Sequence, residues 1–137
     1  MLRSTKKEVK EKIRAYILDC MDFSNYIGYD GYPDKEPETW QSKVFLCRSI
    51  FRWEYVNPQN LRRYGGERGC FREWLCGLPS ALSIDYNYYD VRQIVRGWLE
   101  QTEDDANKYD DAQVWDEYLH LVTREFFAMV EAAEKQK

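Results

Sequence analysis

Apolar residues recur along much of this chain with the spacing of a helix. The stretch 88–102 shows the pattern at its clearest, because its apolar positions match the i, i+3, i+4, i+7, i+8 template throughout. These positions are Val91, Ile94, Val95, Trp98 and Leu99. Asn87 precedes them as a suitable N-cap. We therefore predict a helix here, with Trp98 in the protein core.

Two longer apolar stripes predict helices over residues 37–55 and 111–134. Pro37 suits the start of the first helix, whose many large apolar side chains predict a central, well-buried element. Its stripe consists of Trp40, Val44, Cys47, Phe51 and Tyr55. In the second helix, Asp110 and Asp111 complement the helix dipole at the N-terminus. Its stripe consists of Trp115, Tyr118, Leu119, Val122, Phe126, Met129, Val130 and Ala133.

Weaker patterns complete the predicted architecture. A capping box of Thr5 and Glu8 opens a helix over 5–21, and Asn60 caps a short helix that ends at the glycines 65–66. Another short helix covers 69–77. The stretch 82–86 alternates like a strand but lacks a partner strand, so an extended connector is expected. Residues 1–137 are thus predicted to form a single all-α domain, a bundle or orthogonal array of five to six helices.

A loop rich in tyrosine and glycine is expected at about 22–37. Gly28, Gly31 and Pro33 mark turns, and Tyr26, Tyr29 and Tyr32 are interleaved with them. Loops of this length frequently carry function, and adaptable loops of Tyr, Gly and Asp form binding surfaces. A tyrosine at the rim of a core equally needs no partner. The three tyrosines are therefore candidate binding residues, with a rim position as the alternative.

Composition defines the broad class of the protein. The chain has 137 residues, 44% of them apolar and 32% charged, which is typical of one globular domain. A net charge of −4 gives no global reason to bind nucleic acid or an acidic membrane. No apolar run approaches the roughly 18 residues of a membrane helix, and none follows the basic start as in a signal peptide. We expect a cytoplasmic protein that has no membrane contact and keeps Cys20, Cys47, Cys70 and Cys76 as buried free thiols.

The sequence carries no recognisable catalytic or metal-binding motif. The cysteines form no C-x-x-C pair, and His120 has no second histidine to act with. A calcium loop starting at Asp105 fails, because Asp110 stands where the loop requires glycine. The glycines of 65–69 lack the lysine of a phosphate-binding loop. We therefore predict no catalytic residues, no metal and no cofactor, and keep an enzyme with an unrecognised site as an alternative to a binding protein.

Charge is distributed unevenly along the chain. Residues 41–72 contain seven basic and two acidic side chains, for a net charge of +5. Residues 100–125 contain nine acidic and two basic side chains, for a net charge of −7. The simplest interpretation is that the two regions lie against each other or are solvated separately. The functional interpretation assigns binding to the basic segment, with candidate residues Arg62, Arg63, Tyr64, Arg68 and Arg72. We expect the four arginines to lie on a turn between two short helices, with at least three of them exposed.

Aromatic residues among these arginines define the candidate partners. Arginine beside exposed aromatic rings is used to hold single-stranded nucleic acid, and the same residue types dominate protein–protein hot spots. The favoured interpretation is that Phe71 and Trp74 belong to the core and only the arginines are outside. Because the acidic C-terminal region would repel a long polyanion, a protein partner is favoured and nucleic acid is the second possibility.

Three short segments carry a family resemblance. FREWLCGLPS (71–80), QVW (113–115) and REFF (124–127) resemble segments of small uncharacterised proteins of bacterial mobile elements and phages, over roughly the C-terminal half. The resemblance implies a bacterial or phage cytoplasmic accessory protein, and it carries over no active site.

Overall fold

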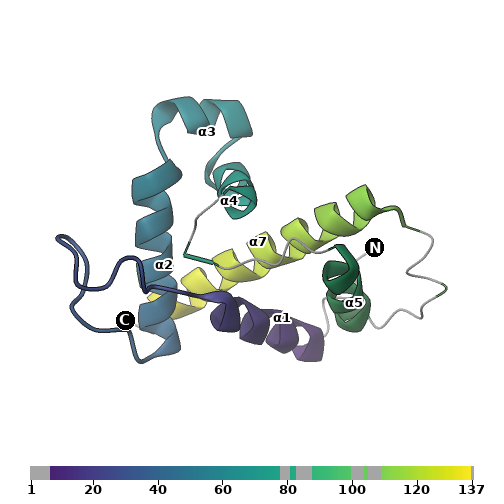
Figure 1. Ribbon diagram of the computed structural model, residues 1–137, viewed down its shortest axis with the longest axis horizontal. Helices are drawn as coiled ribbons and strands as arrows, with labels where there is room; N and C mark the ends of the chain where they lie inside the picture. The colour runs from purple at the N-terminus through teal and green to yellow at the C-terminus, as the bar shows by residue number, and fades with distance from the viewer. Residues whose placement is uncertain (1–6, 78–80, 83–87, 100–103, 105–108, 137) are drawn as a thin grey trace.

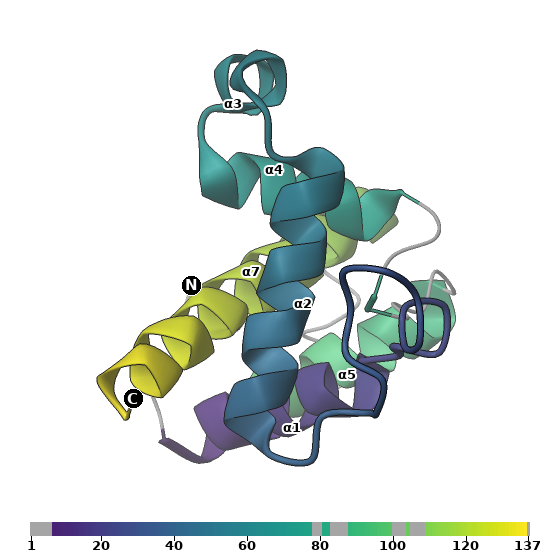
Figure 2. The same cartoon turned by 90° about the vertical axis from the view of Figure 1, so that its left-hand side faces the viewer.

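Helices account for nearly all regular structure in the part of the chain that the structure describes. Figure 1 shows the computed structural model, which describes residues 7–77, 81–82, 88–99, 104 and 109–136. The helices are α1 (Lys7–Cys20), α2 (Trp40–Tyr55), α3 (Pro58–Tyr64), α4 (Glu67–Cys76), α5 (Tyr88–Leu99) and α7 (Asp111–Lys135). The all-α prediction is confirmed. Helix α2 crosses α7 steeply in both Figure 1 and Figure 2, so the helices form an orthogonal array rather than an up-and-down bundle.

Helix α7 is the central element of this array. Twelve of its 25 residues are buried, on the predicted stripe and off it, as expected of a helix covered on several sides. Helices α1, α2, α4 and α5 pack against it. The expectation that the helix ending at residue 55 would be central was wrong, because α2 buries one face and leaves Trp53 83% exposed on the other.

Two clusters of aromatic rings attach the other helices to α7. Near its N-terminal half, Trp98 of α5 stacks on Tyr118 of α7 with ring centroids 5.8 Å apart, and Tyr16 of α1 meets both rings edge-on. Further along, Phe71 of α4 stacks on Phe126 of α7 at 4.5 Å and meets Phe51 of α2 at 5.1 Å. Each cluster therefore joins three elements at one point.

Capping side chains decide where the helices begin. Helix α2 starts at Trp40 rather than at Pro37, because Thr39 has extended backbone angles and accepts a hydrogen bond from the Ser42 amide. Helix α3 is capped by Asn57 rather than by Asn60, whose own amide donates to the Asn57 side chain. Pro58 then occupies the first helical position, where a missing amide hydrogen costs nothing.

The remaining element expectations are confirmed in part. The core positions of the helix starting at Tyr88 are buried, with Ile94 half-buried, and Trp98 is 5% exposed. At the connector, Leu82 forms an isolated antiparallel bridge with Met21, and Ala81 accepts a hydrogen bond from the Asp22 amide. Thr5, Asn87 and the stretches 83–86 and 100–102 lie outside the described residues. No helix in the described part has the length and apolar character needed to span a bilayer.

All four cysteines are free thiols, as expected, but not all are buried. Cys47 and Cys70 are buried, Cys20 is half-buried and Cys76 is exposed. Burial raises the pKa of the Cys47 thiol and, less strongly, that of Cys70, because desolvation disfavours the thiolate. Cys76 is exposed because it is the last residue of the short helix α4, although desolvation raises the pKa of its thiol as well.

The stacking of Trp98 on Tyr118 leads to a stability prediction. Replacing Trp98 by alanine removes a buried indole from the junction of α1, α5 and α7, and we expect the free energy of unfolding to fall by about 3–5 kcal/mol. Denaturant unfolding followed by circular dichroism measures this change. The control is Trp53→Ala, which removes an exposed indole and should change the free energy by about 0.5 kcal/mol or less. Equal effects of the two substitutions would contradict the assignment of Trp98 to the core.

The state of the cysteines leads to a second prediction. We expect a reductant to leave the melting temperature unchanged, because no disulfide contributes to stability. A thiol reagent should modify Cys76 rapidly in the native protein and modify Cys47 and Cys70 on unfolding, because burial blocks access and suppresses the thiolate. Cys76→Ser is the control and should remove the rapid phase. A melting temperature that drops by many degrees on reduction would show that a disulfide forms.

Candidate functional site

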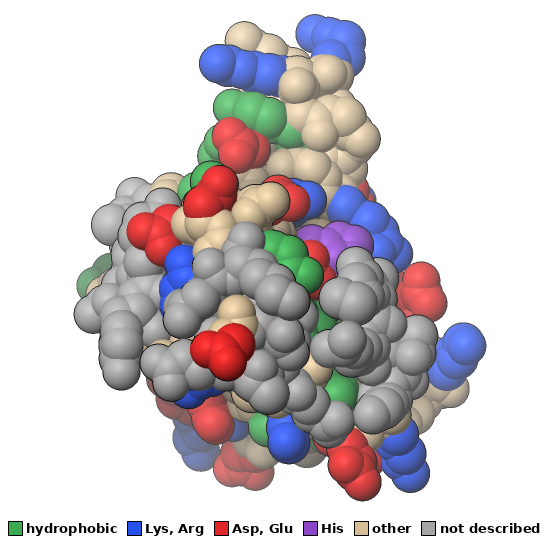
Figure 3. All heavy atoms as spheres, turned by 90° about the vertical axis from the view of Figure 1, so that its right-hand side faces the viewer, with side chains coloured by type: hydrophobic (Ala, Val, Ile, Leu, Met, Phe, Trp, Pro, Cys, Tyr) green, Lys and Arg blue, Asp and Glu red, His purple; other side chains and the backbone are tan. Residues whose placement is uncertain are grey.

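The basic segment identified in the sequence lies in two helices. Arg62 and Arg63 occupy the last turn of α3, and Arg68 and Arg72 lie in α4, rather than in the turn between them. The first three side chains are exposed and Arg72 is half-buried, which confirms the expected exposure of at least three arginines. Helix α3 projects from the body of the molecule, and basic side chains gather at this projecting end in Figure 3.

Part of the basic charge is neutralised by α7. Arg72 forms an ion pair with Asp116 of α7 at 2.5 Å. Arg48 of α2 lies 3.8 Å from Glu134 of α7, and it also lies 3.6 Å from Glu67 of α4. The basic segment and the acidic C-terminal region therefore lie against each other here, as the simplest interpretation of the charge pattern predicts.

The aromatic side chains among the arginines are mostly buried in the protein core. Phe71 and Trp74 are 0% and 4% exposed, so their rings belong to the core and are not accessible for stacking with a nucleobase. Tyr64 is half-buried and stacks on Tyr55 with centroids 6.0 Å apart. Arg68 lies over the Phe127 ring, 4.9 Å from its centroid. What projects is a basic tip, which we define as Arg62 and Arg63 of α3; within the described residues neither forms an ion pair.

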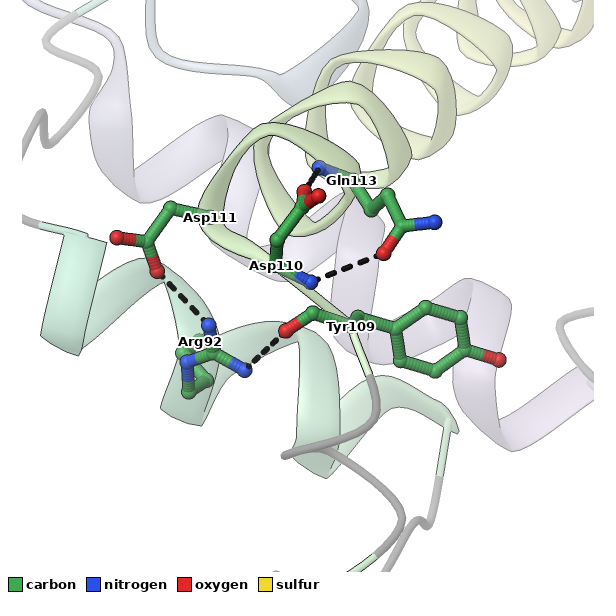
Figure 4. Close-up of polar contacts among 5 residues, drawn as sticks. All are labelled: Arg92, Tyr109, Asp110, Asp111 and Gln113. Carbon is green, nitrogen blue, oxygen red and sulfur yellow. Dashed lines mark hydrogen bonds and ion pairs between the residues drawn. The ribbon is translucent and has the colours of Figure 1, made fainter.

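The acidic residues at the start of α7 have structural roles. Figure 4 shows that Asp110 accepts a hydrogen bond from the Gln113 amide while the Gln113 side chain accepts one from the Asp110 amide, a reciprocal capping box. Asp111 forms an ion pair with Arg92 of α5 at 2.8 Å. Arg92 also donates to the carbonyl of Tyr109 at 3.1 Å. Asp105 and Asn107 of the considered calcium loop lie outside the described residues, and His120 is half-buried in α7.

A buried carboxylate, which the sequence pattern did not reveal, lies in the middle of α7. Glu125 is 1% exposed and accepts hydrogen bonds from Nε of Arg14 at 3.0 Å and from Nε of Arg124 at 2.9 Å. Two guanidinium groups compensate the buried charge, which would otherwise be costly. Its place off the apolar stripe made it look like a surface residue. The contact ties α1 to α7 and has the character of a structural ion pair. Within the described residues, no group of His, Cys, Asp and Glu side chains is arranged to hold a metal ion.

The tyrosine-rich loop is an ordered series of turns between α1 and α2. The Tyr29 amide donates to the carbonyl of Tyr26, and the Tyr32 amide donates to the carbonyl of Tyr29. These turns require positive φ at Gly28 and Gly31, which have φ of 87° and 89°. The glycines therefore permit the two consecutive turns that link the three tyrosines.

Glu54 of α2 fixes the start of this loop. Its carboxylate accepts hydrogen bonds from the Tyr26 hydroxyl at 3.2 Å and from Nε1 of Trp74 at 3.1 Å. Tyr26 is 8% exposed, so it is a core residue rather than an external contact. Burial and the neighbouring carboxylate raise the pKa of Tyr26 to about 12. The ring of Tyr26 in turn supports Tyr32 edge-on, with centroids 5.5 Å apart.

An aromatic pocket lies where the loop runs beside α2, as Figure 2 shows for the two elements. It has a volume of about 340 Å³ and is lined by Asp30, Gly31, Tyr32, Ser49 and Trp53. Ser49 and Trp53 are four residues apart and so share one face of α2. Trp53 is 83% exposed, and Tyr29, next to the lining residue Asp30, is 65% exposed. Of the three candidate tyrosines, only Tyr32 is among the residues that line the pocket. Tyr29 is adjacent in sequence to the lining residue Asp30, and the ring of Tyr26 packs against Tyr32.

The loop around the aromatic pocket is acidic. Residues 22–39 contain one basic side chain and five exposed acidic ones, for a net charge of −4. The acidic residues are Asp22, Asp30, Asp34, Glu36 and Glu38. Within the described part of the chain none of them forms an ion pair, and Asp22 accepts a hydrogen bond from the Ser24 amide. This charge is therefore available to a partner, whereas Asp111, Asp116 and Glu125 of α7 are paired with arginines.

Sequence reasoning missed Trp53, although a signal was present. The residue lies two positions after Phe51, which places it about 200° away from the apolar stripe of α2. A tryptophan on the polar face of an amphipathic helix has no core to enter and marks an exposed apolar surface.

Comparison of the chain with protein-family models, curated proteins and solved structures finds no match. The resemblance to proteins of phages and mobile elements stays a prediction.

Proposed function

We propose that this protein is a non-enzymatic binding module whose partner is another protein, contacted through the aromatic pocket. The observation that carries the proposal is the 83% exposure of Trp53 at the edge of a pocket formed by α2 and the loop. Tryptophan and tyrosine are enriched at the centres of protein interfaces, where burial of a large ring supplies most of the binding free energy. An indole kept in water gains this free energy only when a partner covers it.

The proposal is supported by the side chains that hold Tyr32 of the pocket in place. Tyr32 is backed by Tyr26, and Tyr26 is held by Glu54, which also accepts from Trp74 of the core. A surface whose rings are already positioned loses little conformational entropy on binding. The four free thiols fit a reducing compartment, and we place this interaction in the cytoplasm.

A nucleic acid is the second candidate partner, and the basic tip favours it. Arg62 and Arg63 are exposed on the projecting helix α3 and lack an acidic partner within the described residues. Two observations favour a protein instead. Phe71 and Trp74, the rings that would stack on bases, are buried. Paired charges on Arg72 and Arg48 also reduce the positive potential around the tip.

The protein-binding proposal is tested by site-specific photocrosslinking. A benzoylphenylalanine in place of Trp53 keeps an aromatic ring at the pocket, and we expect it to form an adduct with one defined protein in lysate of the source cell. The matched control carries the same group at Ala112, an exposed position at the start of α7, far from α2 in Figure 1. Trp53→Ala should then weaken non-covalent binding of that protein about tenfold or more, as expected for a central interface tryptophan.

Three outcomes contradict the proposal. They are the absence of a protein adduct at position 53, the same adducts at positions 53 and 112, and unchanged partner affinity in Trp53→Ala. The melting temperature of Trp53→Ala serves as the control for folding, and it should stay unchanged because the indole is exposed.

The basic tip leads to a separate prediction on nucleic acid. We expect weak or no binding of duplex or single-stranded oligonucleotides at physiological salt in a fluorescence-anisotropy titration, because few unpaired arginines face outward. Phosphate binding would weaken steeply with salt, by roughly 0.9 log units per log unit of salt for each phosphate neutralised on a duplex. Submicromolar affinity that disappears in an Arg62→Ala/Arg63→Ala variant would favour nucleic acid over a protein as the partner.

A further inference from the structure

We propose that the aromatic pocket receives a basic side chain, lysine or arginine, of the partner protein. This inference rests on the proposed function and names the chemistry that the same site selects. It is carried by the lining of the pocket, by the charge around it and by its size.

The lining combines one carboxylate with two aromatic rings. Asp30 is the acidic residue of the lining, and Tyr32 and Trp53 are its aromatic residues. The face of an aromatic ring carries partial negative charge and attracts an ammonium or guanidinium group, most strongly when the ring is an indole. A carboxylate at the same place adds a charge-assisted hydrogen bond. A neutral apolar side chain would use the rings but leave the carboxylate desolvated without a partner, which disfavours it.

The surroundings of the pocket carry the complementary charge. The loop of residues 22–39 has a net charge of −4, and its acidic side chains are exposed and unpaired within the described residues. Arg48, Arg52 and Lys35 are the basic residues nearest to the lining in sequence, and none of them lines the pocket. An acidic rim accelerates association with a basic segment and repels an acidic one. The charge therefore selects for a basic partner segment.

The pocket is large enough to hold one long side chain. Its volume of about 340 Å³ lies at the low end of the range of roughly 300–1,000 Å³ found for small-molecule sites. The Trp53 indole is exposed to water in the free protein. The attraction between a cation and this ring strengthens when a partner covers both and excludes water from them. A free small cation would leave that surface wet, whereas a protein would cover it.

The test titrates the protein with three small probes of similar length. They are Nα-acetyl-lysine amide, Nα-acetyl-arginine amide and the uncharged Nα-acetyl-norleucine amide. Binding is followed by the NMR signal of the Trp53 indole N–H, which is assigned as the signal missing in Trp53→Phe. We expect a saturable shift with both cationic probes and an affinity about fivefold or more above that for norleucine amide.

A matched pair of variants separates a specific contact from general charge. Asp30→Asn removes the carboxylate in the lining, and Asp34→Asn removes the same charge from the same loop outside the lining. Asp30→Asn should lower the affinity for lysine amide severalfold, and Asp34→Asn should change it little. Both residues are exposed, so both variants should fold normally, which the NMR spectra report directly.

The outcomes distinguish this inference from the proposed function. Equal or tighter binding of norleucine amide, equal effects of the two Asn variants, or no saturable shift with either cation would overturn the basic-side-chain assignment. Crosslinking at position 53 can still succeed in each of these cases, and the protein-binding proposal would then stand with a different contact. Preferential binding of the cationic probes together with failed crosslinking would overturn the protein partner and leave a site for small cations.

Discussion

The enclosure of α7 by four other helices is the constraint on which the rest of the structure depends. Twelve residues of this helix are buried, and two aromatic clusters attach α1, α5, α2 and α4 to it at separate points. Rings of this size bury much apolar surface and pack in a limited set of orientations, so each cluster restricts the crossing angle of the helices it joins. The orthogonal array follows from these two junctions rather than from the short connections between helices.

The same enclosure determines which charges are left for binding. Because α7 is surrounded, several of its acidic side chains meet arginines from neighbouring helices: Glu125 meets Arg14, Asp116 meets Arg72 and Asp111 meets Arg92. The loop of residues 22–39 adds five exposed acidic side chains that form no ion pair within the described residues. Arg62 and Arg63 of the basic tip also form no ion pair there. The two candidate binding surfaces are thus formed by charged side chains that are not paired across the core.

The aromatic pocket lies between one face of helix α2 and the irregular loop that precedes this helix. Glu54 accepts hydrogen bonds from Tyr26 of the loop and from Trp74 of α4, so the polar contact that orders the loop is continuous with the core. Trp53 precedes Glu54 on α2, about 100° away around the helix axis, and its indole is in water. Neighbouring positions of one helix therefore have different roles: Glu54 holds the loop, and Trp53 is left exposed, where we propose that a partner binds. Functional residues on loops supported by rigid elements are a common arrangement, because the scaffold supplies position and the loop supplies chemistry.

The sequence by itself determined the helical class, the approximate extent of most helices, the core position of Trp98 and the order of the acidic and basic segments. These properties depend on local periodicity, which short stretches of chain encode directly. It did not determine that α7 rather than α2 is central, that Glu125 is buried, or that Trp53 is exposed. The sequence also did not show that Asp30 and Tyr32 line one pocket together with Trp53. These features join residues far apart in sequence, and only the packing of one helix face against another decides which side chains meet there and which remain in water.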